Sequence, residues 1–140
     1  MAEYINPTKE SFREFREAPA VGKIHMLNLV KFHELAQYDD GRKATGAEAY
    51  ATYGAESGPI FRALGGQIIW AGRPEVMLIG PGDAEDWDRA FIAEYPDLSA
   101  FVSMIRDPDY QRAAIHRTAG VKDSRLIRMA PLEAGAGFGD

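Results

Sequence analysis

The strongest constraint on this chain is the order in which strand-like and helix-like segments follow one another. Runs rich in β-branched and aromatic residues, bounded by glycine or proline, predict strands. Apolar residues at helical spacing behind a capping residue predict helices. The expected strands are residues 23–33, residues 67–71 with a continuation at 75–79, residues 89–95 and residues 124–129. The expected helices are residues 8–17, a long helix from Thr45 to the Gly65-Gly66 pair that Gly58-Pro59 kinks or splits, a helix capped by Asp97 and one from Asp107 to about residue 118.

Without the first helix, this order is βαββαβ, with the last helical region divided at Asp107. It is the order of the ferredoxin-like split βαβ unit. We therefore predict an α+β domain whose four-stranded antiparallel sheet carries helices on one face, with an extra N-terminal helix. We expect an N-terminal helical extension over residues 1–20, a ferredoxin-like domain over residues 21–131 and a flexible tail over residues 132–140.

The predicted strands are apolar on both faces. In the first strand, alternation places Met26 and Val30 on one side and Leu27 and Leu29 on the other. A sheet with helices on one face only would leave the second apolar face exposed to water. We therefore expect a homodimer that forms through the sheet faces.

Composition excludes several classes of partner and chemistry. The 140 residues carry a formal net charge of −5 without a basic cluster, so a nucleic-acid partner is not expected. The absence of cysteine excludes disulfides and thiolate nucleophiles and suits a reducing compartment. Neither a signal peptide nor a membrane-spanning segment is predicted, so we expect a cytoplasmic protein without a membrane partner.

Two polar residues interrupt the apolar strands: Asn28 in the first and Glu94 in the third. A buried carboxylate is costly unless it is paired, and desolvation would raise the pKa of Glu94 into a range that suits acid–base catalysis. Two interpretations of Glu94 stay open: it acts in a pocket, or it is structural and either pairs with Arg125 or Arg128 of the closing strand or lies at an edge. Asn28 either binds a ligand oxygen or bridges to the backbone.

The long helix and the histidines supply further candidates. Tyr50 and Tyr53 lie three residues apart and either line a pocket or pack on the sheet. His25, His33 and His116 lack the spacing of metal ligands, so neither a metal nor a haem nor another cofactor is expected. His116 lies in a last helical turn, where it either interacts with the helix dipole or transfers a proton.

Several stretches resemble a known bacterial family. They are HMLNLVKF from His25, TGAEAYATYG from Thr45, GGQIIWAGRP from Gly65, EYPD from Glu94, and DPDYQ from Asp107 with the HRT that follows it. Together they resemble the domain of unknown function 1330 (DUF1330) family, from about residue 22 to residue 129. The resemblance implies a ferredoxin-like fold and a dimeric α/β barrel but no activity. The positions that it marks as typical of the family are Asn28, Tyr53, Glu94, Tyr110 and Arg117.

Two functional hypotheses follow. In the first, the protein is a cofactor-independent isomerase or monooxygenase acting on a small, partly apolar organic acid or aromatic compound. Glu94 or His116 would then be catalytic and would move a proton. Substrate-binding candidates are Asn28, Tyr50, Tyr53, Tyr110 and Arg117. In the second hypothesis, the same pocket belongs to a non-catalytic ligand-binding or stress-related dimer. A third interpretation makes the polar residues purely structural.

Overall fold

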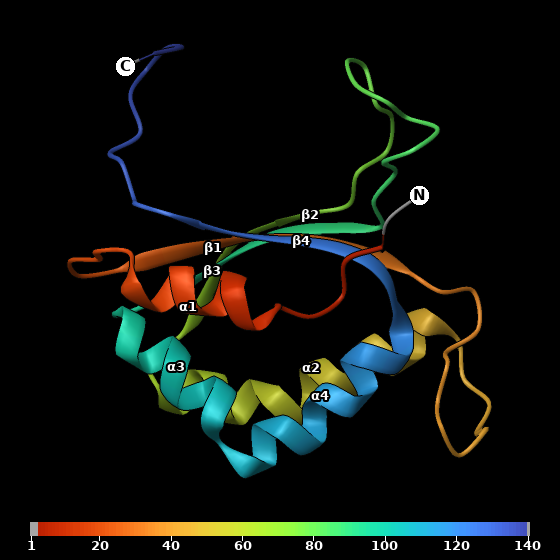
Figure 1. Cartoon of the computed structure of the whole chain (residues 1–140). Helices are drawn as coiled ribbons and strands as arrows, with labels where there is room; N and C mark the ends of the chain where they lie inside the picture. The colour runs from red at the N-terminus through yellow and green to blue at the C-terminus, as the bar shows by residue number, and fades with distance from the viewer. Residues whose placement is uncertain (1–2, 140) are drawn as a thin grey trace.

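The computed structural model describes residues 3–139 and has two layers, a sheet and a set of helices (Figure 1). The elements in chain order are α1 (Lys9–Glu17), β1 (Ile24–Phe32), α2 (Gly46–Ala63), β2 (Gln67–Gly72), β3 (Arg89–Tyr95), α3 (Leu98–Arg106), α4 (Pro108–Gly120) and β4 (Val121–Met129). With α1 set aside, the order is βαββαβ, and the second helical region is divided into α3 and α4.

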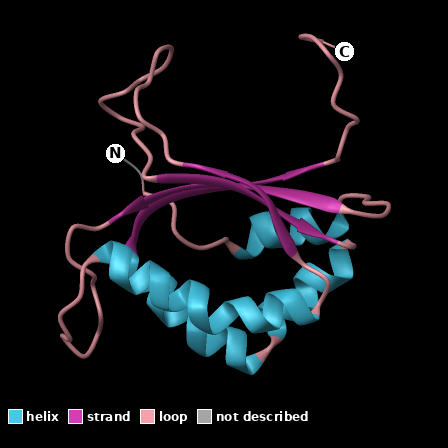
Figure 2. Ribbon diagram, turned by 180° about the vertical axis from the view of Figure 1, so that it is seen from behind, coloured by secondary structure: helices cyan, strands magenta, loops and turns pink. Residues whose placement is uncertain are grey.

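The strands lie in the order β2-β3-β1-β4, and each neighbouring pair is antiparallel. The predicted ferredoxin-like α+β fold, with its four-stranded antiparallel sheet and extra N-terminal helix, is therefore confirmed. All the helices drawn in Figures 1 and 2 lie on one side of this sheet. We call the side that they cover the helix face and the other side the open face. Within residues 3–139, no helix is long and apolar enough to cross a membrane.

The helices begin where the sequence places capping residues. Thr45 accepts a hydrogen bond from the Glu48 backbone, and the Glu48 carboxylate accepts one from the Thr45 N–H, at 3.0 and 2.8 Å. Asp97 caps α3, and Asp107 caps α4 in front of Pro108. These side chains satisfy N–H groups that have no partner within the helix, so they fix the start of each helix.

The hydrophobic core lies between the helix face of the sheet and helices α2, α3 and α4. Its buried residues are Ile24, Met26, Ala93, Tyr95, Ala100, Phe101, Met104 and Tyr110. Helix α1 closes one side of this core, because the Phe15 ring packs edge-on against Phe101 with the ring centroids 5.0 Å apart. Arg128 of β4 donates to the Phe15 carbonyl at 2.9 Å, which ties α1 to the edge of the sheet.

Two expectations about the elements were wrong, and one of the two alternatives for the long helix, a split, is ruled out. Residues 75–79 form no strand, because β2 ends at Gly72 and the apolar run beyond Pro74 has no neighbouring strand to pair with. Strand β4 begins at Val121, three residues before the predicted start. Helix α2 is not split at Pro59 and runs on to Ala63. Gly58 explains its continuity, because a residue without a Cβ relieves the usual clash with the proline ring that follows.

The start of α2 and the end of α4 approach each other at backbone distance. The N–H of Gly46 donates to the His33 carbonyl at 3.1 Å, and His33 in turn donates to the Gly120 carbonyl at 2.9 Å. A Cβ at position 46 would overlap the His33 carbonyl and lie 2.8 Å from the Gly120 carbonyl. Glycine at position 46 therefore allows α2, α4 and the end of β1 to pack together.

We expect Gly46→Ala to lower the free energy of unfolding by about 1–3 kcal/mol, as overpacking of a closed site does. Gly54→Ala is the matched control on the same helix, because a Cβ there meets nothing within 4 Å. It should stabilise the protein by up to about 1 kcal/mol through helix propensity. Urea unfolding followed by circular dichroism measures both. Equal effects of the two substitutions would contradict the close approach.

Candidate functional site

Three tyrosines from two helices form a contiguous group on the helix face. Tyr50 and Tyr53 lie one turn apart on α2, with ring centroids 5.4 Å apart. The Tyr53 hydroxyl is 2.8 Å from the Tyr110 hydroxyl of α4, and their rings meet edge to face. Tyr50 also contacts Phe32 at the end of β1, with ring centroids 5.3 Å apart. The structure thus brings together three predicted ligand-binding residues that lie up to 60 positions apart in sequence.

Arg117 lies two turns after Tyr110 on the same side of α4. Its guanidinium is partly buried, donating to the Ile5 carbonyl at 2.6 Å and to the Ser124 hydroxyl at 3.3 Å. The Ser124 hydroxyl donates to the Tyr4 carbonyl at 2.7 Å. The segment before α1 therefore lies against the start of β4 and holds the arginine in place. Within residues 3–139, Arg117 forms no ion pair with a carboxylate.

Burial sets the protonation of the tyrosines. It raises the pKa of Tyr50 and of Tyr110 far above the ordinary tyrosine value, and the nearby charge of Arg117 only partly opposes the rise. Both hydroxyls are therefore neutral at physiological pH. A neutral hydroxyl is a hydrogen-bond donor, and donors next to a cation favour an anionic oxygen.

Asn28 lies on the helix face of β1, opposite Phe91 of β3 and Leu126 of β4. Its side-chain nitrogen donates to the Met26 carbonyl at 3.0 Å, which is the backbone bridge that the sequence left open as an alternative. Leu126 is 44% exposed, although the pairing with Asn28 places it on the face that the helices cover. The helix layer therefore does not close completely over the centre of β1 and β4.

Glu94 lies on the open face, so it does not converge with Asn28. Its carboxylate is 2.9 Å from His25 Nε2, accepts from the Gln67 amide at 3.0 Å and is 3.6 Å from the Lys23 ammonium. The hydrogen bonds from Gln67 and His25 lower the pKa of Glu94, against the expectation that desolvation would raise it.

The alternative expectation, that Glu94 pairs with an arginine of the closing strand, was also wrong. Arg125 pairs with Asp123 and Glu85, and Arg128 donates to backbone carbonyls around the end of α1. Glu94 lies on β3, where its neighbours across the strands come from β1 and β2. The position of β3 between these two strands explains why His25 and Gln67 take the place of the arginines.

His116 lies apart from both groups, between a loop and α2. Its Nδ1 is 2.6 Å from the Tyr38 hydroxyl, and its Nε2 is 3.3 Å from the Glu56 carboxylate. This arrangement fixes the imidazole from both sides and ties the loop that follows β1 to α2 and α4. No local sequence pattern indicates this contact, because Tyr38 is 78 residues from His116.

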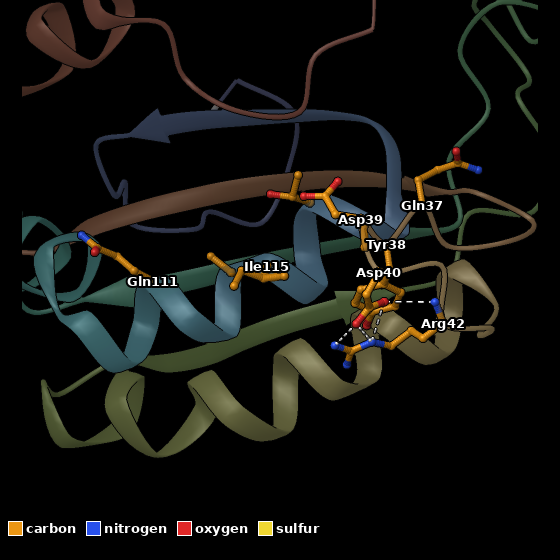
Figure 3. A pocket seen from close by; sticks show the side chains of 10 residues that line it. Gln37, Tyr38, Asp39, Asp40, Arg42, Gln111 and Ile115 are labelled. Atoms are coloured by element: carbon orange, nitrogen blue, oxygen red, sulfur yellow. Dashed lines mark hydrogen bonds and ion pairs between the residues drawn. The ribbon is translucent and has the colours of Figure 1, made fainter.

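A surface pocket of about 340 Å³ lies beside this loop and α4 (Figure 3). Tyr38, Gln111 and Ile115 are among its lining residues, and Arg42 pairs with Asp40 at its rim. Sequence reasoning missed this pocket, since its only local signal is the turn at Asp39-Asp40-Gly41. None of the predicted site residues lines it. The described residues contain no group of three or more His, Asp or Glu side chains placed to hold a metal ion.

The chain is similar to one described protein family and to several solved structures. The family described as domain of unknown function DUF1330 matches residues 41–129. The crystal structure of the methylated RPA0582 protein is 57% identical, with a TM-score of 0.93 over 97% of this chain and 100% of that one. RPA0582 from Rhodopseudomonas palustris, described as a protein of unknown function, is 56% identical, with a TM-score of 0.91 over 95% of this chain and 100% of that one.

A more distant structure shares only the fold. It is SnoaB, described as a cofactor-independent oxygenase from Streptomyces nogalater, which is 15% identical with a TM-score of 0.54 over 81% of this chain and 97% of that one. No curated protein matches this chain.

Because folding lowers the pKa of Glu94, the free energy of unfolding should depend on pH. A carboxyl whose pKa is depressed by folding stabilises the fold above its ordinary value, 4.5, and loses that contribution as the pH falls through the folded-state pKa. Glu94→Gln should therefore lower the free energy of unfolding at pH 7 by about 0.5–1 kcal/mol. The difference from wild type should shrink as the pH falls below 4.5 and through the folded-state pKa of Glu94. Urea unfolding at several pH values measures it, and a difference that does not depend on pH would contradict the proposed ionic contacts.

Proposed function

The chain belongs to the DUF1330 family, and we propose that it binds a small, partly apolar organic anion between the sheet and the helices, at Arg117 and the tyrosine hydroxyls. The observation that carries this proposal is the partly buried guanidinium of Arg117, which donates to a carbonyl and a hydroxyl and has no carboxylate partner among residues 3–139. Removing a charge from water is costly unless a counter-ion compensates it. A bound carboxylate or enolate would supply that counter-ion.

The surroundings of Arg117 support a ligand that is apolar at one end. The Tyr53 and Tyr110 hydroxyls lie 2.8 Å apart, so one donates to the other and the remaining proton can be donated to an anionic oxygen. Arg117 supplies a bidentate partner for a carboxylate. The Phe32 ring and the half-exposed Leu126 supply apolar surface on the same side of the sheet. A few polar groups within an apolar wall are typical of small-molecule sites.

Catalysis at this site is the second candidate. Neutral hydroxyl donors and a cation stabilise an enolate oxygen, which both an isomerase and a cofactor-independent oxygenase require. SnoaB shows that this fold accommodates oxygenase activity, although its likeness to this chain extends to the fold alone. Neither predicted proton-transfer residue lies beside the tyrosines, since Glu94 lies on the other face of the sheet and His116 is held by Tyr38 and Glu56.

We further propose that the protein forms a homodimer through the open face. Leu27, Leu29 and Ile92 lie on this face, and Trp70 and Ile127 are exposed beside them. Pairing two such faces would remove an apolar surface from water. The cytoplasm stays the predicted location.

Binding can be tested with benzoate as the probe and benzamide as its neutral counterpart. We expect wild-type protein to prefer benzoate in isothermal titration calorimetry. Arg117→Gln should weaken benzoate binding by roughly 10- to 100-fold, because a hydrogen bond to a charged group is lost. Arg112→Gln on the same helix is the matched control, because Arg112 is exposed and pairs with Asp109. Equal affinity of wild type and Arg117→Gln for benzoate, in folded proteins, would contradict the proposal.

The catalytic candidate can be tested with phenylpyruvate, an enolisable aromatic acid. An enzyme of this kind would accelerate exchange of its benzylic protons with deuterium, measured by nuclear magnetic resonance. Tyr53→Phe should then slow the exchange by roughly tenfold or more, because one donor to the enolate oxygen is lost. Glu94→Gln should leave the rate unchanged, because its carboxylate lies on the opposite face. Loss of exchange in Glu94→Gln, with the fold and dimer intact, would instead make Glu94 the base.

A further inference from the structure

The loop of residues 73–88 joins β2 to β3 and stands away from the body of the protein. In Figure 1 it is the green loop that rises from the sheet on the side opposite the helices. The blue C-terminal segment rises on the same side, from the other end of the sheet (Figures 1 and 2). The two segments therefore flank the open face. We call residues 73–88 the β2–β3 arm.

The tip of the arm is apolar and almost fully exposed to water. Val76, Leu78 and Ile79 are 87, 91 and 89% exposed. Met77 behaves differently, because its side chain folds back against Gly80. Three large apolar side chains within four residues, at such exposure, form a patch that is unusual for a free surface loop and typical of a protein interface.

The base of the arm is fixed to the sheet. The Asp88 carboxylate accepts from the Phe32 N–H at 2.8 Å, and the Asp88 N–H donates to the Val30 carbonyl at 2.8 Å. Lys31 pairs with Asp86 at 2.8 Å. These contacts attach the arm to the end of β1, so the direction in which the tip projects is set by the sheet rather than left to an unanchored loop.

We propose that the β2–β3 arm clasps a second copy of this chain, with its apolar tip packed on the partner subunit beyond the plane of the open face. This inference rests on the homodimer proposed above. In a two-fold dimer each subunit presents the same patch, so an arm that rises past its own open face necessarily extends alongside its partner. The arm then buries side chains that find no cover in their own subunit.

Charge favours a protein partner over a lipid surface. The arm carries five acidic residues, Glu75, Asp83, Glu85, Asp86 and Asp88, against one basic residue, Arg73, and the chain as a whole has a net charge of −5. Anionic membranes repel such a segment, and the cationic residues that normally accompany an apolar membrane anchor are absent from the tip.

The test compares dimer dissociation in wild type and in the double variant Leu78→Asp, Ile79→Asp. Sedimentation equilibrium and light scattering over a dilution series measure the dissociation constant, and circular dichroism checks the fold. Both side chains are almost fully exposed in the single subunit, so the substitutions should leave its fold intact. We expect a dissociation constant raised by roughly tenfold or more, as for central interface residues. Val21→Asp is the matched control, because Val21 is 98% exposed and lies outside the arm.

A second measurement reports on the tip directly. The chain contains no cysteine, so Leu78→Cys carries a polarity-sensitive fluorophore at one defined place. Its emission should shift to the blue in the dimer and return on dilution. A dimeric wild type, with an unchanged dissociation constant in the double variant and no emission shift, would overturn the arm proposal and leave the sheet-mediated dimer standing.

A wild type that stays monomeric throughout the dilution series would overturn both the dimer and the arm proposals. So would a monomer that sediments with phosphatidylcholine vesicles only when its tip is intact, since that result would assign the tip to a lipid surface. Neither result bears on anion binding at Arg117, which benzoate titration tests separately.

Discussion

Helices cover one face of the sheet, and this constraint determines the surroundings of every strand residue. Because side chains alternate across a strand, neighbours along β1 experience different environments. Met26 is buried in the core, whereas His25 lies beside Glu94 on the open face. Helices α2 and α4 carry the tyrosines and Arg117 on the covered side of the sheet, whereas alternation along β3 places Glu94 on the other side. Chemistry at either place must therefore use the groups on its own side.

The element order was readable from the sequence because its determinants are local. Thr45, Asp97 and Asp107 accept hydrogen bonds from N–H groups within three residues of themselves. These caps can therefore be recognised from the sequence without knowledge of the fold. The strand predicted at residues 75–79 does not form, because strand pairing depends on contacts that are not local. Its composition is typical of a strand, but a strand also needs a neighbour to pair with, and apolar composition alone cannot show one.

The candidate site was only partly readable. Alternation showed which residues share a face, but it showed neither which face the helices cover nor that Gln67 and His25 would hydrogen-bond the Glu94 carboxylate and lower its pKa. The pairing of Tyr53 with Tyr110 spans 57 residues, and that of Arg117 with Ile5 spans 112. Such contacts depend on tertiary packing, and no spacing rule within one helix or strand predicts them. The resemblance to a family marked Tyr53, Tyr110 and Arg117 as positions, and the structure adds the contacts.

The hydrogen bond from Arg117 to the Ile5 carbonyl would couple anion binding at Arg117 to the attachment of the segment before α1. One of the guanidinium's donors is already occupied by the segment that precedes α1. An anion that reaches Arg117 must either share the guanidinium with this carbonyl or displace it. In the first case the anion and the segment reinforce each other, and in the second they compete for the same N–H groups. If the proposed anion binds there, reciprocity requires that the factor by which the attached segment changes the affinity for the anion equals the factor by which the anion changes the attachment of residues 4–5 to β4.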